Sequence, residues 1–388
     1  MRMRSKLNRN NGIYAKLFVA QAKYYLETVQ NELSTIINIM VDNFAFWRYT
    51  SYRLLYREEK AVDMKQLAKE IIGGRRLRRG ENLSFFEEVD LEELIGGADL
   101  IRQSLCGNRV DLCTIINGRG GRCSENCKFC AQSAHNHTGC TEHGMLTAEE
   151  VLEDCKAREA AGVHAYSIVT AGRTVEGKDL DRLVETYDLL HRECGLRLCA
   201  SHGLISEEAF ARLKQAGVEM YHANIETSER YFPFICTTHT FQDKLREIEL
   251  AKAAGLTVCS GGIIGMGETW QDRLDMALTL AELEIPSIPI NALIPVKGTP
   301  FEGLTPLTQE EILRTVAMFR YLNPTAYIRM AAGRNYFPDG GKRLFRAGVN
   351  ATITGDMLTT VGNNTAQDRE MLTGMGFDIH TDVSRKER

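Results

Sequence analysis

The chain has 388 residues, of which 44% are hydrophobic and 25% are charged, a composition typical of a folded protein with a sizeable core. A formal net charge of −4 argues against a general nucleic-acid or membrane-surface binder. The most apolar early stretch, residues 33–47, contains Asn38, Asp42 and Asn43 and is too short to span a bilayer. We therefore expect a cytoplasmic protein, with neither a nucleic acid nor a membrane as a partner.

The first 63 residues are rich in Tyr, Asn and Arg and show no alternation of strands and helices. We interpret residues 1–63 as an N-terminal extension that is helical over part of its length and either dispensable or poorly ordered. The alternative is a helical cap. Met64 begins MKQLAKEIIGG, which predicts a helical lead-in to a second region, residues 64–388, with a short C-terminal tail.

From about residue 110, short β-type runs alternate with amphipathic stretches. Strands are predicted over residues 110–117, 164–172, 195–201, 218–226, 256–265, 287–295, 326–333 and 349–355. Helices are predicted near residues 147–162, 178–194, 206–216, 240–254, 268–283, 308–321, 340–347 and 365–375. Thr147, followed three residues later by Glu150, predicts a capping box. Eight β-then-α units predict an α/β fold, a (β/α)8 TIM-type barrel with its site at the C-terminal ends of the strands. A doubly wound sheet is the alternative.

The most informative motif is CSENCKFC at residues 123–130, which places Cys123, Cys127 and Cys130 in a CxxxCxxC array. Three thiolates on one loop suit three irons of a [4Fe–4S] cluster and leave the fourth iron open for chemistry. Zinc sites usually use four ligands with CxxC pairs, and three cysteines within eight residues cannot all form local disulfides. The spacing therefore favours an iron–sulfur centre.

With Phe129 directly before the last cysteine, this motif resembles that of the radical S-adenosylmethionine (SAM) enzymes. The resemblance implies that the open iron binds SAM and that one electron breaks its C–S bond to release a deoxyadenosyl radical. It also implies an electron donor such as flavodoxin or ferredoxin.

Beyond this loop, residues 64–377 resemble the biotin synthases. The matching segments are CAQSAH, NIETS, TTHTF, CSGGIIGMGET, PINALIPVKGTP, YIRMAAGR and LTT, in that order along the chain. The resemblance implies radical-mediated insertion of sulfur into dethiobiotin to give biotin, with the sulfur taken from an auxiliary iron–sulfur cluster. It also implies a homodimer.

In most biotin synthases the auxiliary cluster is [2Fe–2S], bound by three cysteines and an arginine. The resemblance places two of these cysteines at Cys199 and Cys259 and the arginine at Arg329, but the remaining position is Ser167. Cys113, on the neighbouring predicted strand, is a candidate to replace the cysteine missing at position 167. Its thiol would lie about 5 Å from that position, one interstrand spacing. We hypothesise a cluster held by Cys113, Cys199 and Cys259, with Arg329 or Cys236 nearby. It is either [2Fe–2S] or a larger, sulfur-rich type. Cys106, Cys140, Cys155 and Cys194 are interpreted as small buried hydrophobes.

The resemblance also implies contacts with the small molecules. Asn224 would lie between the cofactor and the substrate, and Glu226 would contact the ribose of SAM. Gly262 and Gly265 would allow SAM to approach the backbone closely. Asn291 would contact the ureido ring of dethiobiotin, and Thr359 and Thr360 its carboxylate.

Arg173 and Arg334 are interpreted either as carboxylate contacts or as solvated residues, and His135, His137 and His143 as loop residues. The alternatives for function are a hydrogenase-cluster maturase, a methylornithine synthase-like mutase and a non-enzymatic iron–sulfur scaffold.

Overall fold

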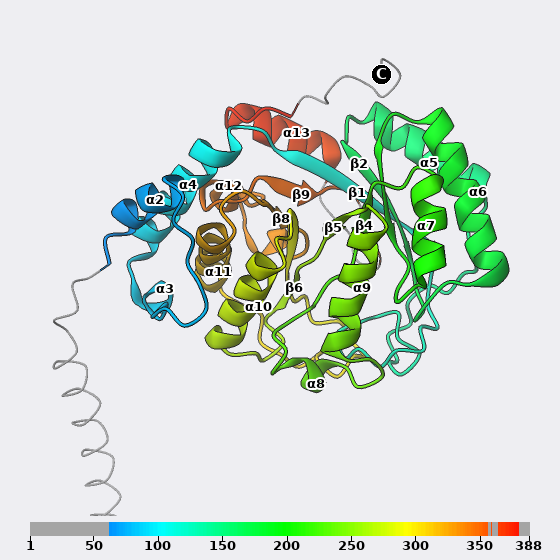
Figure 1. Cartoon of the computed structure of the whole chain (residues 1–388), viewed down its shortest axis with the longest axis horizontal. Helices are drawn as coiled ribbons and strands as arrows, with labels where there is room; N and C mark the ends of the chain where they lie inside the picture. Colours follow the sequence, from blue (N-terminus) through cyan, green and yellow to red (C-terminus); the bar gives the residue numbers. More distant parts are fainter. Residues whose placement is uncertain (1–61, 356–357, 359–363, 380–388) are drawn as a thin grey trace, which may run out of the picture. The chain divides into compact units, whose positions relative to one another are not determined.

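The computed structural model describes residues 62–355, 358 and 364–379 (Figure 1). The chain divides into two compact units, Met1–Ala61 and Val62–Arg388, and all described residues belong to the second. Most of the predicted N-terminal extension, together with Thr359 and Thr360, therefore lies outside the described residues.

The described strands form one parallel sheet that closes on itself. They are β1 (Asp111–Arg119), β2 (Ala165–Thr170), β3 (Arg197–Ser201), β4 (Met220–His222), β5 (Thr257–Cys259), β6 (Gly262–Ile264), β7 (Ser287–Ala292), β8 (Tyr327–Met330) and β9 (Ala351–Ile353). Their order is β5-β4-β3-β2-β1-β9-β8-β7-β6, and the Cys259–Ser287 pairing joins β5 to β7. Because β5 and β6 are two parts of the predicted strand 256–265, the sheet is an eight-stranded barrel. The predicted (β/α)8 fold is confirmed, and the doubly wound alternative is wrong.

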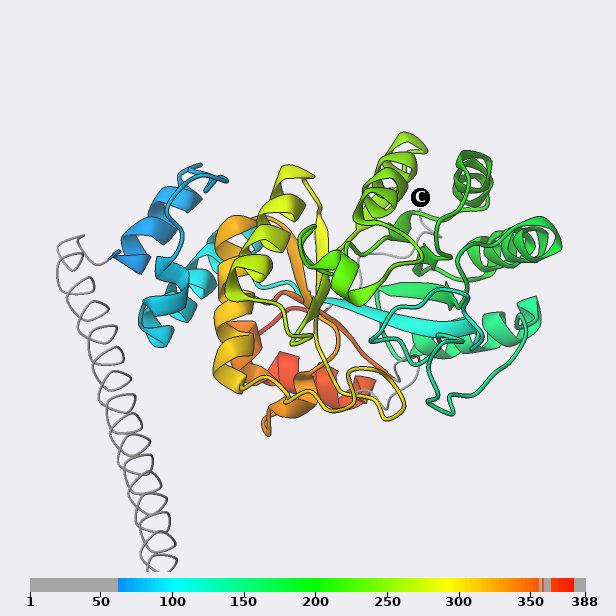
Figure 2. The same cartoon turned by 90° about the horizontal axis from the view of Figure 1, so that it is seen from below.

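Helices follow the strands and lie outside the barrel (Figures 1 and 2). They are α5 (Ala148–Ala160), α6 (Gly177–Glu193), α7 (Glu207–Gln215), α9 (Phe241–Ala253), α10 (Trp270–Glu282), α11 (Gln309–Leu322), α12 (Lys342–Arg346) and α13 (Thr365–Gly374). The predicted capping box at Thr147 and Glu150 is present at the start of α5. Matching boxes begin α9, α10 and α11, so helix starts along the barrel are fixed by local sequence.

Three lead-in helices precede the barrel: α2 (Met64–Ile72), α3 (Phe85–Glu88) and α4 (Leu91–Cys106). The α4 helix contacts α2, α11 and α12, which places it against the outer helical layer. Two short elements, α8 (Phe232–Ile235) and η1 (Arg334–Tyr336), lie in connections that follow strands. Within the described part of the chain, no helix is both long and apolar enough to cross a membrane.

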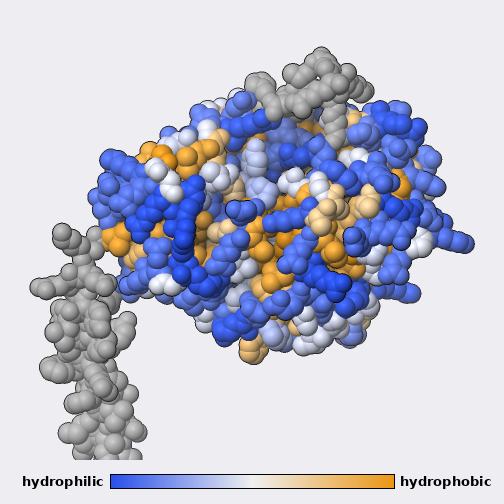
Figure 3. Space-filling view, viewed as in Figure 1, coloured by the Kyte–Doolittle hydropathy of each residue, from blue (hydrophilic) through white to orange (hydrophobic). Residues whose placement is uncertain are grey.

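Buried side chains form two separate clusters. The larger one fills the space between strands and helices, and the smaller one comprises Cys113, Ala165, Cys199, Met220 and Cys259. The smaller cluster takes one residue from each of the five strands β1 to β5, on the side away from the main core, so it lies on the inner face of the barrel. The outer face seen in Figure 3 is mostly hydrophilic, with hydrophobic residues showing between the outer elements. This pattern agrees with amphipathic helices packed around a barrel.

Candidate functional site

The cysteines of the CxxxCxxC motif lie on the loop that connects β1 to α5, at the C-terminal end of the barrel. The Cys123 amide donates to the carbonyl of Gln132 at 2.9 Å, and the Asn136 side chain donates to the carbonyls of Cys127 and Cys130 at 3.2 and 2.8 Å. The three thiols are half-buried, and Phe129 packs against the main core. The loop is thus folded by its own hydrogen bonds and keeps its thiols within reach of a ligand.

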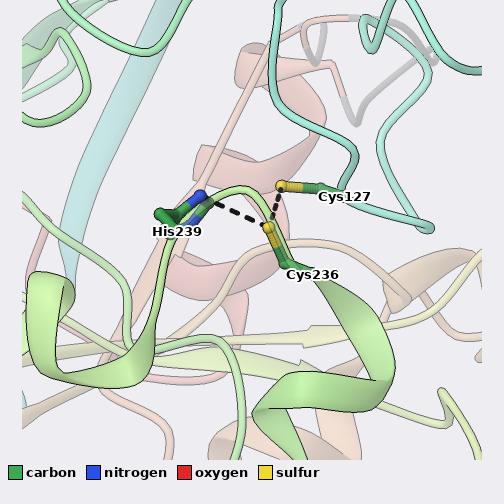
Figure 4. A group of neighbouring side chains, drawn as sticks. All are labelled: Cys127, Cys236 and His239. Carbon is green, nitrogen blue, oxygen red and sulfur yellow. Dashed lines mark hydrogen bonds between the residues drawn. The ribbon is translucent and has the colours of Figure 1, made fainter.

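A fourth cysteine contacts this loop. Cys236, directly after α8, has its Sγ 3.7 Å from Sγ of Cys127 and 3.3 Å from Nδ1 of His239 (Figure 4). The same ring nitrogen makes a short contact with the Glu125 carboxylate. The hypothesis that Cys236 lies near the auxiliary cysteines is wrong, because the chain after β4 brings it to the CxxxCxxC loop instead.

The metal-free thiols of this group differ in acidity. The hydrogen bond with Cys127 lowers the pKa of Cys236 to about 3, and the same contact together with burial raises that of Cys127. Burial raises the pKa of Cys130 to about 11. Cys236 is therefore the most acidic thiol next to the loop.

The second set of predicted ligands does come together. Cys113, Cys199 and Cys259 belong to the smaller buried cluster, in which Sγ of Cys113 contacts the carbonyl of Thr114 at 3.6 Å and Sγ of Cys199 that of Arg197 at 3.8 Å. The neighbouring Cys199 thiol and the charge of Arg329 lower the pKa of Cys113, whereas the Cys113 thiol and burial raise the pKa of Cys199. Three thiols from three strands thus share one interior.

Arg329 lies beside these thiols and forms part of an ion network with Asp111 and Arg197. Its guanidinium contacts the Asp111 carboxylate and donates to the carbonyl of Thr352 at 2.9 Å. Arg197 approaches the same carboxylate at 2.9 Å. Burial would raise the pKa of Asp111, but the charges of Arg329 and Arg197 hold it well below its usual range. Arg329 is therefore paired with a carboxylate that it shares with Arg197, and the three groups together keep a net positive charge.

The register corrects the predicted displacement between Ser167 and Cys113. Cys113 pairs with Ala165, whereas Ser167 pairs with Ile115 and Cys199. A thiol at position 113 is thus one strand across and two residues back from position 167. The backbone displacement is about 8 Å, from about 4.8 Å across and 6.6 Å along the strands, instead of about 5 Å. The thiol set consequently lies deeper in the barrel, next to Asp111 and Arg197.

Several buried polar atoms of the inner face have no hydrogen-bond partner. They include Oγ of Ser167 and Nε2 of His222, each two residues after a member of the smaller cluster and hence on the same strand face, and Oε2 of Glu226. Buried polar groups are normally satisfied, so such atoms indicate a ligand with complementary groups. The three thiols and these orphaned atoms fit a sulfur-rich metal cluster and a polar small molecule within the barrel.

Asn224 and Glu226 do not share a strand as predicted. The β4 strand ends at His222, and Glu226 has a φ of 66°. Oδ1 of Asn224 accepts from the amide of Gly261 at 3.2 Å, and burial raises the pKa of Glu226 to about 7. A left-handed backbone at a residue other than glycine is strained, a feature that is common at functional sites.

Packing and backbone conformation also require glycine at the two positions that were expected to contact SAM. A Cβ at Gly262 would lie 2.3 Å from the carbonyl oxygen of Glu226 and 2.6 Å from the sulfur of Met276. Gly265 has a φ of 93°, and its amide donates to Glu268 at 2.7 Å. Gly262 thus allows close packing of two chain segments, and Gly265 allows a left-handed turn.

Asn291 lies on β7, and both ends of its amide are used. Nδ2 donates to the carbonyl of Gly262 at 3.2 Å, and Oδ1 accepts from the amide of Ala332 at 3.2 Å. This arrangement orients the side chain between neighbouring strands. Arg334 is buried against Asp368, so the solvated interpretation of this arginine is wrong. Arg173 remains partly exposed and contacts Glu125.

The sequence analysis missed His239, Glu125, Asp111 and Arg197. A signal for the last two was available, because DLC at residues 111–113 and RLC at 197–199 each place a charge two residues before a cysteine on the same strand face. His135 and His143 contact backbone carbonyls of the loop, at Ser124 and Gly144.

Comparisons with known proteins agree with this architecture. Residues 119–280 match the model of the radical SAM superfamily, and residues 289–378 match the biotin and thiamin synthesis associated domain. The chain is 63% identical to a biotin synthase of Alkaliphilus metalliredigens over 82% of this chain and 100% of the relative, and 62% identical to one of Clostridium beijerinckii over 81% and 100%. A crystal structure of methylornithine synthase has the same fold, with a TM-score of 0.71 at 21% identity over 82% of this chain and 97% of that one. The chain therefore belongs to the biotin synthase family of radical SAM enzymes.

Proposed function

We propose that this chain converts dethiobiotin to biotin and takes the sulfur atom from an auxiliary cluster held by Cys113, Cys199 and Cys259. The observation behind this proposal is the gathering of these three thiols on the inner face of the barrel, apart from the cysteines of the CxxxCxxC loop. A radical SAM enzyme that only isomerises its substrate has no use for a second thiol set.

Cys123, Cys127 and Cys130 would hold a [4Fe–4S] cluster, with Phe129 beside it. When bound, this cluster and SAM supply the radical chemistry that removes hydrogen atoms from unactivated carbon. Asn224 and Glu226 would orient SAM, and the raised pKa of Glu226 keeps a large share of its carboxyl groups protonated near neutral pH before ligand binds.

The substrate would lie between the two thiol sets. Asn291, fixed by its bonds to Gly262 and Ala332, presents its amide edge to the ureido ring. Thr359 and Thr360 are proposed for the carboxylate end. The auxiliary cluster is consumed as a sulfur donor and is therefore a substrate of the reaction. Arg329, on the Asp111 carboxylate, would provide a positive charge beside the sulfur-rich anion.

The test is anaerobic incubation of the reconstituted protein with SAM, dethiobiotin and a low-potential reductant such as reduced flavodoxin, with biotin and 5′-deoxyadenosine measured by mass spectrometry. We expect both products from the wild type. Cys113→Ala should still form deoxyadenosine but no biotin, and Cys155→Ala, which removes a buried thiol of α5, should form both. Deoxyadenosine without biotin from the wild-type protein would contradict the proposal and favour a mutase.

A further inference from the structure

Cys236 and His239 have no part in the function proposed above, yet they adjoin the CxxxCxxC loop. Their ligand atoms and Sγ of Cys127 all lie within 4.8 Å of one another (Figure 4). Among the described residues, this is the one group of three such side chains with ligand atoms this close. Cys236 is buried, whereas Cys127 and His239 are half-buried, so the group can be reached from solvent.

The spacing of these atoms suits a single metal ion. With metal–sulfur bonds of about 2.3 Å and metal–nitrogen bonds of about 2.05 Å, tetrahedral geometry puts two sulfurs about 3.8 Å apart and a sulfur and a nitrogen about 3.5 Å apart. The observed separations are 3.7 Å between the Sγ atoms of Cys127 and Cys236, and 3.3 Å between Cys236 Sγ and His239 Nδ1. Thiolates of a cubane bind different irons, so a pair this close points to one shared ion.

Neighbouring residues hold the side chains of Cys236 and His239 in place. The Glu125 carboxylate, which contacts the His239 ring, also accepts from the Thr238 hydroxyl at 2.7 Å and from Arg173 at 3.3 Å. Asn126 lies 3.4 Å from Cys236 Sγ through its side-chain oxygen. Glu125 contacts Nδ1 itself, so this contact holds the ring beside Cys236 and is given up when Nδ1 binds an ion. Glu125 then keeps its bonds to Thr238 and Arg173.

We propose that, in the cluster-free chain, Cys127, Cys236 and His239 bind one divalent transition-metal ion, Fe²⁺ or Zn²⁺. Two thiol protons and any proton on Nδ1 are released to solvent as the ion binds, and no electron is transferred. Because Cys127 is shared, this ion and the [4Fe–4S] cluster exclude each other. Fe²⁺ in the site is held where cluster assembly needs it, whereas Zn²⁺ blocks assembly.

The test uses Co²⁺ as a spectroscopic probe in cluster-free protein. A Cys123→Ser/Cys130→Ser background removes the competing loop thiols and leaves the proposed ligands in place. We expect the intense visible bands of tetrahedral, thiolate-bound Co²⁺ in this background. Adding Cys236→Ser or His239→Ala should lower the bound Co²⁺ by one equivalent, whereas adding Cys140→Ser, on the same loop, should leave it unchanged. Circular dichroism checks that each variant is folded.

Unchanged Co²⁺ spectra in the Cys236→Ser and His239→Ala variants would overturn the inference. Competition then identifies the ion: displacement of Co²⁺ by Zn²⁺ alone marks a zinc site, and anaerobic binding of Fe²⁺ marks an iron-holding site. The inference does not depend on the proposed function. Cys236→Ser in the otherwise unchanged chain should still reconstitute a [4Fe–4S] cluster, because Cys123, Cys127 and Cys130 remain. Absence of a cluster from the wild-type protein would instead contradict the proposed function.

Discussion

Asp111 is expected to stabilise the barrel more than any surface carboxylate, because it forms ion pairs with two arginines. The side chain of Arg329 is 4% exposed and that of Asp111 is 7% exposed, whereas Arg197 is 31% exposed and partly solvated. Removal of one partner of a buried ion pair costs about 3–5 kcal/mol, since a buried charge is left uncompensated. We therefore expect Asp111→Asn, which preserves volume, to lower the free energy of unfolding by about 4 kcal/mol.

This loss corresponds to a measurable shift of the thermal midpoint. At about 2.1 cal/mol/K per residue, the unfolding entropy of residues 62–388 is about 0.7 kcal/mol/K, so 4 kcal/mol lowers the midpoint by about 6 °C. The assay is urea and thermal unfolding of cluster-free protein, followed by circular dichroism. The matched control is Asp275→Asn, which breaks the exposed pair with Arg79 and should cost less than about 1 kcal/mol.

The pH dependence adds a check of sign. The pKa of Asp111 is lowered in the folded chain, so its contribution is fully present above the unfolded pKa of about 3.9 and is lost as pH falls below it. The stability difference between the wild type and Asp111→Asn should therefore shrink on acidification below about pH 4. If Asp111→Asn is as stable at pH 7 as Asp275→Asn, this account of the ion network is refuted.

Two further substitutions test the site through stability. Burial raises the pKa of Glu226 from 4.5 to about 7, so the folded chain binds this proton more tightly than the unfolded chain does. The free energy of unfolding of the wild type therefore falls by up to about 3 kcal/mol as pH rises from about 4.5 to 7. Glu226→Gln should remove this loss and be more stable than the wild type in urea unfolding at pH 8. If the free energies of unfolding of the two proteins depend on pH in the same way, the raised pKa of Glu226 is contradicted. Gly262→Ala should cost about 1–3 kcal/mol, because its Cβ meets the Glu226 carbonyl, whereas Gly96→Ala, on an exposed part of α4 with nothing within 4 Å, should be neutral or stabilising. Equal midpoints for these two variants in thermal unfolding would show that the close approach at Gly262 is not required.

The fold was predictable because its signals are local and repeated. Each β-then-α unit carries its own strand pattern, and capping boxes such as Thr147 with Glu150 mark several helix starts. Parallel strands joined by helices leave few topologies open. The CxxxCxxC loop was predictable for the same reason, since its three cysteines lie within one segment of eight residues.

The parts of the site that depend on register and on long connections were not predictable in detail. A residue pattern shows that Cys113 faces inward but not that it pairs with Ala165 instead of Ser167. Cys236 reaches Cys127 because the connection after β4 folds over the barrel end, a contact between residues 109 positions apart. The φ of 66° at Glu226 likewise depends on packing against the next strand.

The central claim is that the barrel interior holds a second, sulfur-rich centre at Cys113, Cys199 and Cys259. Mössbauer spectroscopy with iron and sulfide analysis of the anaerobically isolated protein tests it most directly. We predict two spectral components in the wild type, a loss of the second component together with its iron and sulfide in Cys113→Ala, and an unchanged spectrum in Cys155→Ala. A wild-type protein that contains a single [4Fe–4S] component, with the same iron and sulfide content as Cys113→Ala, would contradict the claim.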